Sequence, residues 1–173
     1  IGAEGTLGVI TAATLQLLPE PPEPHTFLLA LPDAAAALAV LQTLQQNTQT
    51  QVLRAEAMWN AFATENAKLQ GSNLLQTLPN AALYVIYEVH CPNGTPEETV
   101  FAALEPHFET GQILDAIAAQ SVQQATDIWW LREDTLSIGT VFPHREWFDI
   151  SVPLAHLDSF VKTVETRIAD LNA

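Results

Sequence analysis

Three glycines near the start of the chain, Gly2, Gly5 and Gly8, are each separated by two residues. Glycines at this density let a backbone approach a ligand closely and present its N–H groups to a phosphate or a ribose. The spacing is not that of the dinucleotide-binding fingerprint, because no strand pattern precedes it and a strand pattern, not a helix, follows it. On spacing alone, the glycines indicate either a nucleotide contact or a tight turn that enters a strand.

The other side chains with reactive groups form no recognisable centre. The five histidines have neither the HxxxH nor the HExxH spacing of a zinc-binding helix, so we predict no metal site. Cys91 is the single cysteine and has no basic neighbour that would favour its thiolate. These residues therefore name no catalytic acid, base or nucleophile.

The composition is that of an acidic protein with enough apolar residues for one core. Six Lys and Arg against 20 Asp and Glu give a formal net charge of -14, and 48% of the residues are hydrophobic. Binding to nucleic acid requires clustered Lys and Arg, and so does binding to an anionic membrane surface, so neither partner is expected. The apolar runs are too short to span a bilayer. We expect a soluble, cytoplasmic protein of about one domain.

Strand and helix patterns alternate after a proline-rich stretch. Strands are predicted over residues 8–19, 26–31, 51–56, 81–90, 113–118 and 148–152. Helices are predicted over residues 34–46, 58–69, 95–108, 121–138 and 153–171. The strand over residues 81–90 is apolar on both faces, which is typical of a central strand. The order predicts an α+β fold, a ferredoxin-like split βαβ arrangement with an antiparallel sheet and helices on one face.

Three sequence blocks, in order, resemble one superfamily of flavoenzymes. Residues 1–11 and the Leu-Leu-Pro of residues 17–19 resemble the closing segment of the FAD-binding domain in FAD-linked oxidases. These oxidases form the vanillyl-alcohol oxidase and para-cresol methylhydroxylase superfamily. Residues 128–133 (Ile-Trp-Trp-Leu-Arg-Glu) and 148–153 (Phe-Asp-Ile-Ser-Val-Pro) resemble blocks of the branch with D-lactate, glycolate and D-2-hydroxyglutarate dehydrogenases. The three blocks span nearly the whole chain.

The resemblance implies a domain division and a set of site residues. Residues 1–19 would be the C-terminal strand of an FAD-binding domain, residues 20–25 a proline-rich linker, and residues 26–173 a truncated substrate or cap domain. FAD would be contacted, mostly through backbone groups, by Gly2, Glu4, Gly5, Gly8 and Ile10. Arg132 would hold the substrate carboxylate, because its guanidinium is a planar fork that can bind a carboxylate with two parallel hydrogen bonds. The alternative for Arg132 is an ion pair with Glu133 or Asp134 on a solvated helix face.

The activity that the resemblance implies is oxidation of a small 2-hydroxy acid, with hydride transfer to flavin and an electron acceptor other than nicotinamide. Many members of the hydroxyglutarate-like subgroup have Ser or Thr four residues after the arginine, where this chain has Leu136. They also have a lysine where this chain has Trp147. Leu and Trp at these positions fit a second carboxylate less well. The chain by itself is expected to be inactive, because one strand of a flavin domain cannot hold FAD.

Two other interpretations stay open. The first is a stand-alone ferredoxin-like binding or oligomerisation module without catalysis, because this fold hosts many unrelated functions. The second is a flavoenzyme subunit that assembles with partner chains, and a homo-oligomer is equally open. A flavin-domain pattern encoded upstream of Ile1 would favour the enzyme, and a start codon directly before Ile1 would favour the module.

Overall fold

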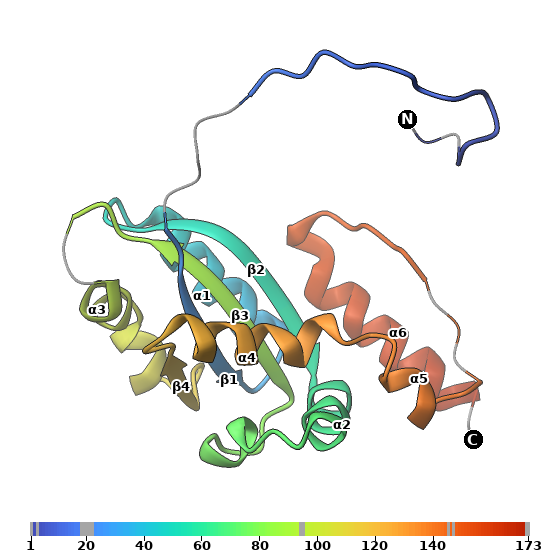
Figure 1. The fold of residues 1–173 in the computed structure, drawn as a ribbon. Helices are drawn as coiled ribbons and strands as arrows, with labels where there is room; N and C mark the ends of the chain where they lie inside the picture. Colours follow the sequence, from blue (N-terminus) through green and yellow to red (C-terminus); the bar gives the residue numbers. More distant parts are fainter. Residues whose placement is uncertain are drawn as a thin grey trace.

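Four strands form one antiparallel sheet in the order β2-β3-β1-β4 (Figure 1). The computed structural model describes residues 2, 4–17, 23–93, 96–144, 146 and 148–171. The strands are β1 (His25–Leu31), β2 (Gln51–Trp59), β3 (Leu83–His90) and β4 (Asp115–Ala118). With the first and third strands central and the second and fourth at the edges, this order is the predicted split βαβ arrangement. The α+β fold class is thereby confirmed.

The two central strands are buried on both faces. Seven of the eight residues of β3 are buried, and six of the seven of β1. Because successive strand residues point to opposite faces, strands that are apolar at almost every position need cover on both sides of the sheet. The central place predicted for the strand over residues 81–90 is confirmed.

Helices accordingly cover both faces of the sheet, and the prediction of helices on one face is wrong. Helices α1 (Ala34–Gln46) and α3 (Pro96–Glu109) pack against the face that carries Phe27 and Leu29. Helices α2 (Asn60–Gln70) and α4 (Val122–Glu133) pack against the opposite face, which carries Leu28. In Figure 1, α4 crosses in front of the strands and α1 lies behind them. Helix α2, which lies between β2 and β3 in the chain, thus helps to cover a face of the sheet that stays open in the simplest split βαβ fold.

Side-chain caps and one glycine set the ends of these helices. Asp33 accepts a hydrogen bond from the backbone N–H of Ala36 at 2.8 Å, so α1 begins at the predicted residue. Ser121 accepts a hydrogen bond from the backbone N–H of Gln124 at 3.1 Å and caps α4, which begins one residue later than predicted. Gly71 ends α2 with a φ of 64°, a left-handed conformation that glycine adopts without strain. Helix α2 begins two residues later than predicted, because Met58 and Trp59 continue β2 opposite Tyr84 and Leu83.

The C-terminal part is more broken than predicted. Helix α4 ends at Glu133 rather than at residue 138, and the Asp134 carboxylate then accepts a hydrogen bond from the Ser137 N–H at 3.0 Å. The short helix α5 (Ile138–Val141) is separate, and a last helix, α6 (Leu157–Leu171), packs against α1. Two 3₁₀ turns are present, η1 (Leu74–Thr77) and η2 (Leu154–His156). No helix of the described residues combines the length and apolar character needed to cross a membrane.

Two predicted strands do not form. The described part of the first, residues 8–17, has no regular structure and is exposed throughout, and it runs away from the sheet in Figure 1. Leu18, Pro19 and linker residues 20–22 lie outside the described residues. Residues 148–152 likewise form no strand, and Phe148 and Ile150 are exposed. A strand exists only through hydrogen bonds to a neighbouring strand, and neither segment pairs with the described sheet.

Candidate functional site

Arg132 lies at the end of α4, beside the edge of the sheet. The helix is anchored by Ile128 and Leu131, which are fully buried against β1 and β3. Arg132 follows Ile128 by four residues and therefore projects from the same side of the helix. Its Nε donates a hydrogen bond to Oε2 of Glu56 on β2 at 3.1 Å. The partner of Arg132 is thus Glu56, and the alternative ion pair with Glu133 or Asp134 is wrong.

A second arginine on the same face, Arg54, binds a buried carboxylate with two parallel hydrogen bonds. Glu88 on β3 is only 5% exposed. Its two oxygens accept hydrogen bonds from Nε and Nη2 of Arg54 at 2.7 and 2.8 Å, and Oε1 also accepts one from the Trp129 indole N–H at 2.6 Å. The Arg54 guanidinium lies 4.1 Å from the centroid of the Trp129 ring. These contacts tie β2, β3 and α4 together one turn before Arg132.

An irregularity in β2 decides which face these side chains occupy. The pairing of β2 with β3 shifts between Val52 and Arg54, which leaves one extra residue in β2. Before the shift, Val52 packs against the face covered by α1, and after it, Met58 packs against the face covered by α4. Without the shift these residues would share a face, because they are separated by an even number of positions. The bulge therefore turns Arg54 and Glu56 toward α4.

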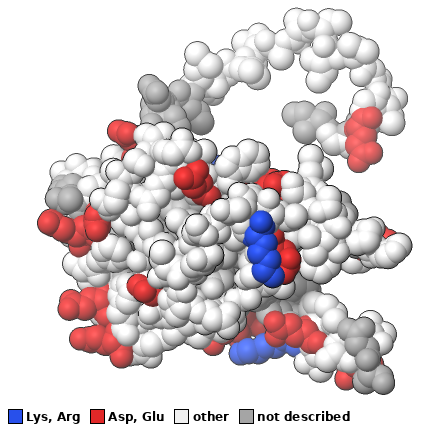
Figure 2. Space-filling view, turned by 60° about the horizontal axis from the view of Figure 1, so that its bottom comes forward, with Lys and Arg blue, Asp and Glu red and all other residues white. Residues whose placement is uncertain are grey.

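The electrostatics of this face are balanced rather than basic. The hydrogen bond to Glu88 raises the pKa of Arg54, the nearby Glu133 and Glu56 carboxylates raise it further, and burial opposes them. Arg54 is therefore charged throughout the physiological range. Figure 2 shows that Asp and Glu predominate on another face of the surface, where the few Lys and Arg lie beside acidic residues. No basic patch for a polyanion is visible there.

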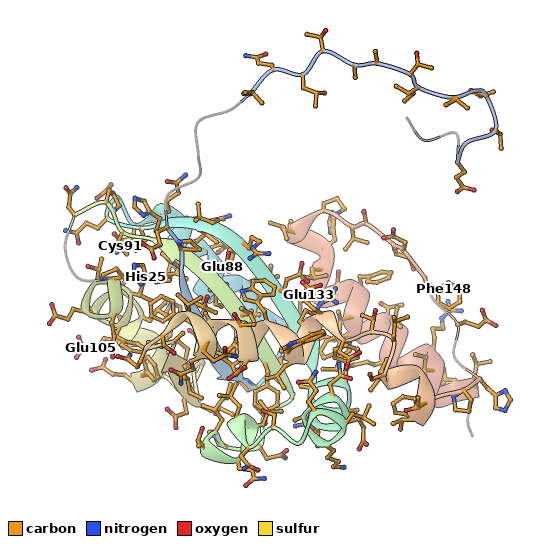
Figure 3. All side chains as sticks on the ribbon, viewed as in Figure 1. His25, Glu88, Cys91, Glu105, Glu133 and Phe148 are labelled. Atoms are coloured by element: carbon orange, nitrogen blue, oxygen red, sulfur yellow. The ribbon has the colours of Figure 1, made fainter. Side chains whose placement is uncertain are left out.

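A cavity of about 690 Å³ opens over these residues. His25 and Thr26 of β1, Arg54, Glu88, Trp129 and Glu133 contribute to its lining. Figure 3 shows His25, Glu88 and Glu133 placed along the upper end of the sheet and α4. Glu23 and Pro24 also line the cavity, so it lies where the N-terminal segment joins the sheet. Its lining mixes charged, polar and apolar side chains, and Arg132 is not one of the lining residues.

Sequence reasoning missed Arg54, Glu56 and Glu88. A signal for Glu88 was present, because it is a carboxylate within an otherwise apolar central strand. Charged residues are almost never buried without a partner, so such a position calls for a cation on a neighbouring element. The sequence does not show that Arg54 is this cation, because the pairing of Arg54 with Glu88 depends on the bulge in β2.

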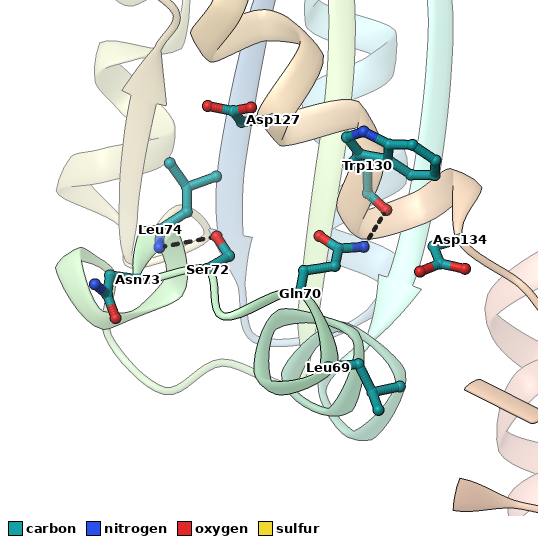
Figure 4. A pocket seen from close by; sticks show the side chains of 8 residues that line it. All are labelled: Leu69, Gln70, Ser72, Asn73, Leu74, Asp127, Trp130 and Asp134. Carbon is teal, nitrogen blue, oxygen red and sulfur yellow. Dashed lines mark hydrogen bonds between the residues drawn. The ribbon is translucent and has the colours of Figure 1, made fainter. Parts of the chain in front are cut away.

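A second hollow lies between α2 and α4, with a volume of about 670 Å³ (Figure 4). Asp127, Trp130 and Asp134 contribute to its lining, and none of its lining residues is basic. An anionic substrate therefore does not fit it. At its edge the Gln70 side chain donates a hydrogen bond to the Trp130 carbonyl at 2.8 Å. This bond links α2 to the last turn of α4, from which Arg132 projects.

Asn66 donates a buried hydrogen bond to the end of α4. Truncation of the Asn66 side chain is expected to destabilise the domain. The side chain of Asn66 is fully buried and donates a hydrogen bond to the Leu131 carbonyl at 3.1 Å. Asn66→Ala leaves this carbonyl unpaired in the core, so the free energy of unfolding should fall by about 2 kcal/mol. Gln70→Ala, which removes an exposed bond to the same helix, should cost less than about 1 kcal/mol. Urea unfolding compares the two variants, and an equal loss in both would contradict the prediction.

The structure does not bring the predicted FAD-contacting residues together with Arg132. Gly2, Glu4, Gly5, Gly8 and Ile10 are all exposed in the segment that runs away from the sheet. The three glycines and Glu4 have positive φ, between 47° and 154°, so the glycines are used for their backbone freedom. Nothing lies within 4 Å of a Cβ atom built at any of the three glycines. Such open backbone fits the approach of a nucleotide or of another domain, and the assignment stays a prediction.

The remaining candidates are metal ligands, the Cys91 thiol, and the two positions that bear on substrate choice, Leu136 and Trp147. Among the described residues, no three His, Cys, Asp or Glu side chains are grouped so as to hold a metal ion. Cys91 is a free, buried thiol, and burial raises its pKa. Leu136 is 84% exposed between α4 and α5. Trp147 lies outside the described residues.

Comparisons with known proteins point to one family. A family model described as FAD linked oxidases, C-terminal domain, matches residues 20–173. The D-2-hydroxyglutarate dehydrogenase of Xanthomonas citri pv. viticola is 29% identical over 98% of this chain and 35% of its own length. That of Stutzerimonas stutzeri is 28% identical over 98% and 36%, and the mitochondrial one of Rattus norvegicus is 30% identical over 97% and 31%. The chain thus spans about a third of the length of these curated relatives.

Proposed function

The chain belongs to the family of FAD linked oxidase C-terminal domains, and from this membership we propose that the whole protein is a flavoenzyme that oxidises a small 2-hydroxy acid at its α-carbon. Bound FAD would accept the hydride, and the electrons would leave to an acceptor other than nicotinamide. The family membership favours this enzyme over a stand-alone module. A cytoplasmic location is part of the proposal, although the relative from Rattus norvegicus is named as mitochondrial.

The proposal depends on the hydrogen bonding and exposure of Arg132. Its Nε is held by Glu56, while its two terminal nitrogens, Nη1 and Nη2, donate no hydrogen bond within the described residues. The side chain is 34% exposed, so these nitrogens are accessible on an otherwise anchored helix. A guanidinium presented in this way binds a carboxylate with two parallel hydrogen bonds. Arg132 would thereby hold the acid so that its α-carbon faces the flavin.

The N-terminal segment supports the FAD part of the proposal. Leu7, Val9, Ile10, Leu15 and Leu17 are large apolar side chains that are all strongly exposed. Contiguous exposed apolar residues of this kind mark surfaces that another unit covers. We assign residues 1–19 to the flavin-binding part, residues 20–25 to a linker and residues 26–173 to the substrate domain. Gly2, Glu4, Gly5, Gly8 and Ile10 would contact FAD.

The substrate proposed is a small 2-hydroxy acid, D-lactate, glycolate or a D-2-hydroxyglutarate-like acid, with a preference for the acids that carry a single carboxylate. Leu136, near Arg132 in the chain, has no polar group that could pair with a second carboxylate. The relatives are named for 2-hydroxyglutarate, which has two carboxylates. The proposal therefore separates this protein from those relatives in substrate preference.

Anaerobic bleaching of the flavin in the purified whole protein tests the proposal. D-lactate, glycolate and D-2-hydroxyglutarate are added separately, and loss of the flavin absorbance is followed by stopped flow. We expect the two monocarboxylic acids to bleach the flavin faster than the dicarboxylic acid, with the L-enantiomer of lactate as the control. A protein without flavin, or a flavin that none of these acids reduces, would refute the proposed activity.

A further inference from the structure

We propose that Glu56 is a positioning residue for Arg132: it holds the guanidinium by Nε and turns the Nη1 and Nη2 edge toward the substrate carboxylate. This inference rests on the function proposed for Arg132. Glu56 itself would touch neither the substrate nor the flavin. Its effect on the reaction would pass through the orientation of Arg132 alone.

The two arginines on this face differ in how many of their guanidinium nitrogens donate hydrogen bonds to a carboxylate. Arg54 gives both Nε and Nη2 to Glu88, and its planar face is covered by Trp129. Arg132 gives only Nε, in one hydrogen bond to Glu56. A guanidinium has five N–H donors, so Arg132 keeps both Nη1 and Nη2 for a ligand, whereas Arg54 gives one of these nitrogens to the buried Glu88 and stacks on Trp129. Glu56 thus holds Arg132 without occupying the Nη1 and Nη2 edge.

Both partners of this ion pair stand on fixed backbone. Glu56 is paired in register with Ile86 of β3, which is fully buried, so its position on β2 is set by the sheet. Arg132 follows Leu131, which is also fully buried, at the end of α4. An arginine side chain loses substantial rotamer entropy when a ligand orders it. A contact that orders the side chain before the substrate arrives removes part of that cost and improves the alignment of the bound acid.

The charges on this face indicate orientation rather than attraction as the source of binding. Arg54 and Arg132 carry two positive charges, and Glu56, Glu88 and Glu133 carry three negative ones, so the cluster has a net charge of about -1 if all five are ionised. Such a cluster does not steer an anionic substrate over long range. If Glu56 merely competed with the substrate for Arg132, its removal would improve binding. If it positions Arg132, its removal weakens binding.

Glu56→Ala and Glu56→Gln in the whole flavoenzyme separate these roles. The acid that bleaches the flavin fastest among D-lactate, glycolate and D-2-hydroxyglutarate serves as substrate. If Glu56 positions Arg132, Glu56→Ala should raise KM about tenfold with a smaller change in kcat. The reason is that the enzyme then binds the substrate and the transition state more weakly by nearly the same amount. Glu56→Gln should stay within about threefold, because the amide oxygen still accepts the Nε hydrogen bond. Glu65→Ala, which removes the exposed partner of Lys68 on α2, is the matched control and should leave KM unchanged.

A double variant completes the experiment. In an Arg132→Ala background, Glu56→Ala should have no further effect on kcat/KM, because its effect passes through Arg132. An unchanged or lowered KM in Glu56→Ala would overturn the inference, and so would an equal loss with and without Arg132. Flavin content and the urea midpoint are measured on each variant. Glu56→Val, which also removes the acceptor and suits a strand, replaces Glu56→Ala if that variant fails to fold, and the same rise in KM is expected. If Arg132→Ala alone leaves kcat/KM unchanged, the proposed role of Arg132 fails, whatever Glu56 does.

Discussion

Arg132→Ala in the whole flavoenzyme is expected to lower kcat/KM for its 2-hydroxy acid by about a thousandfold. Each hydrogen bond between charged groups contributes about 1.5–3 kcal/mol, and about 1.4 kcal/mol corresponds to a factor of ten, so two bonds account for a loss of this size. Arg132→Lys keeps the charge but loses the planar fork, and should therefore recover only part of the activity. Steady-state kinetics over a range of acid concentrations give both constants.

Arg167→Ala on α6 is the matched control, because this arginine is exposed and lies outside the site. It should change kcat/KM by less than about twofold. The flavin content of each variant is measured first, so that a loss of cofactor is not read as a loss of substrate binding. A carboxylate-binding role for Arg132 is wrong if kcat/KM of Arg132→Ala matches that of Arg167→Ala for every acid tested.

Arg54→Ala is expected to lower the free energy of unfolding by about 3 kcal/mol. The Glu88 side chain is 6% exposed, and Arg54 donates two of the three hydrogen bonds that its carboxylate accepts. Removing Arg54 leaves this carboxylate with Trp129 as its remaining hydrogen-bond donor among the described residues. A buried charge without its partner is costly, so the folded state loses stability. Urea unfolding followed by tryptophan fluorescence measures the change.

Two further variants show whether the burial of Glu88 is the cause. Lys68→Ala removes the exposed ion pair with Glu65 and should cost less than about 1 kcal/mol. The double variant Arg54→Met/Glu88→Leu replaces both charges by apolar groups and should regain most of the stability that Arg54→Ala loses. If Arg54→Ala costs no more than Lys68→Ala, the carboxylate of Glu88 does not depend on Arg54.

The apolar pattern of the chain was enough to predict the elements of the core. Residues 81–90 are largely apolar on both faces, and this predicted a central strand, which the sheet contains as β3 (Leu83–His90). The helix start predicted at residue 34 is likewise confirmed, with Asp33 as the cap of α1. Patterns failed for residues 8–17 and 148–152, whose strand-like alternation has no neighbouring strand to pair with. Local pattern sets the capacity to form a strand, and the partner decides whether it forms.

The sequence alone determined the central strand over residues 81–90 and the start of the helix at residue 34, because each of these is a local property of residue type and spacing. Arg132 was singled out only through the resemblance of residues 128–133 to a known block. The tertiary structure alone decided which residue holds Arg132. Glu56 is 76 residues away in the chain, and it meets Arg132 only because a bulge between Val52 and Arg54 turns the rest of β2 toward α4. One residue more or less in that pairing moves every following side chain to the opposite face of the sheet. The register that β3 imposes on β2 is a property of two distant segments together, so neither segment reveals it by itself.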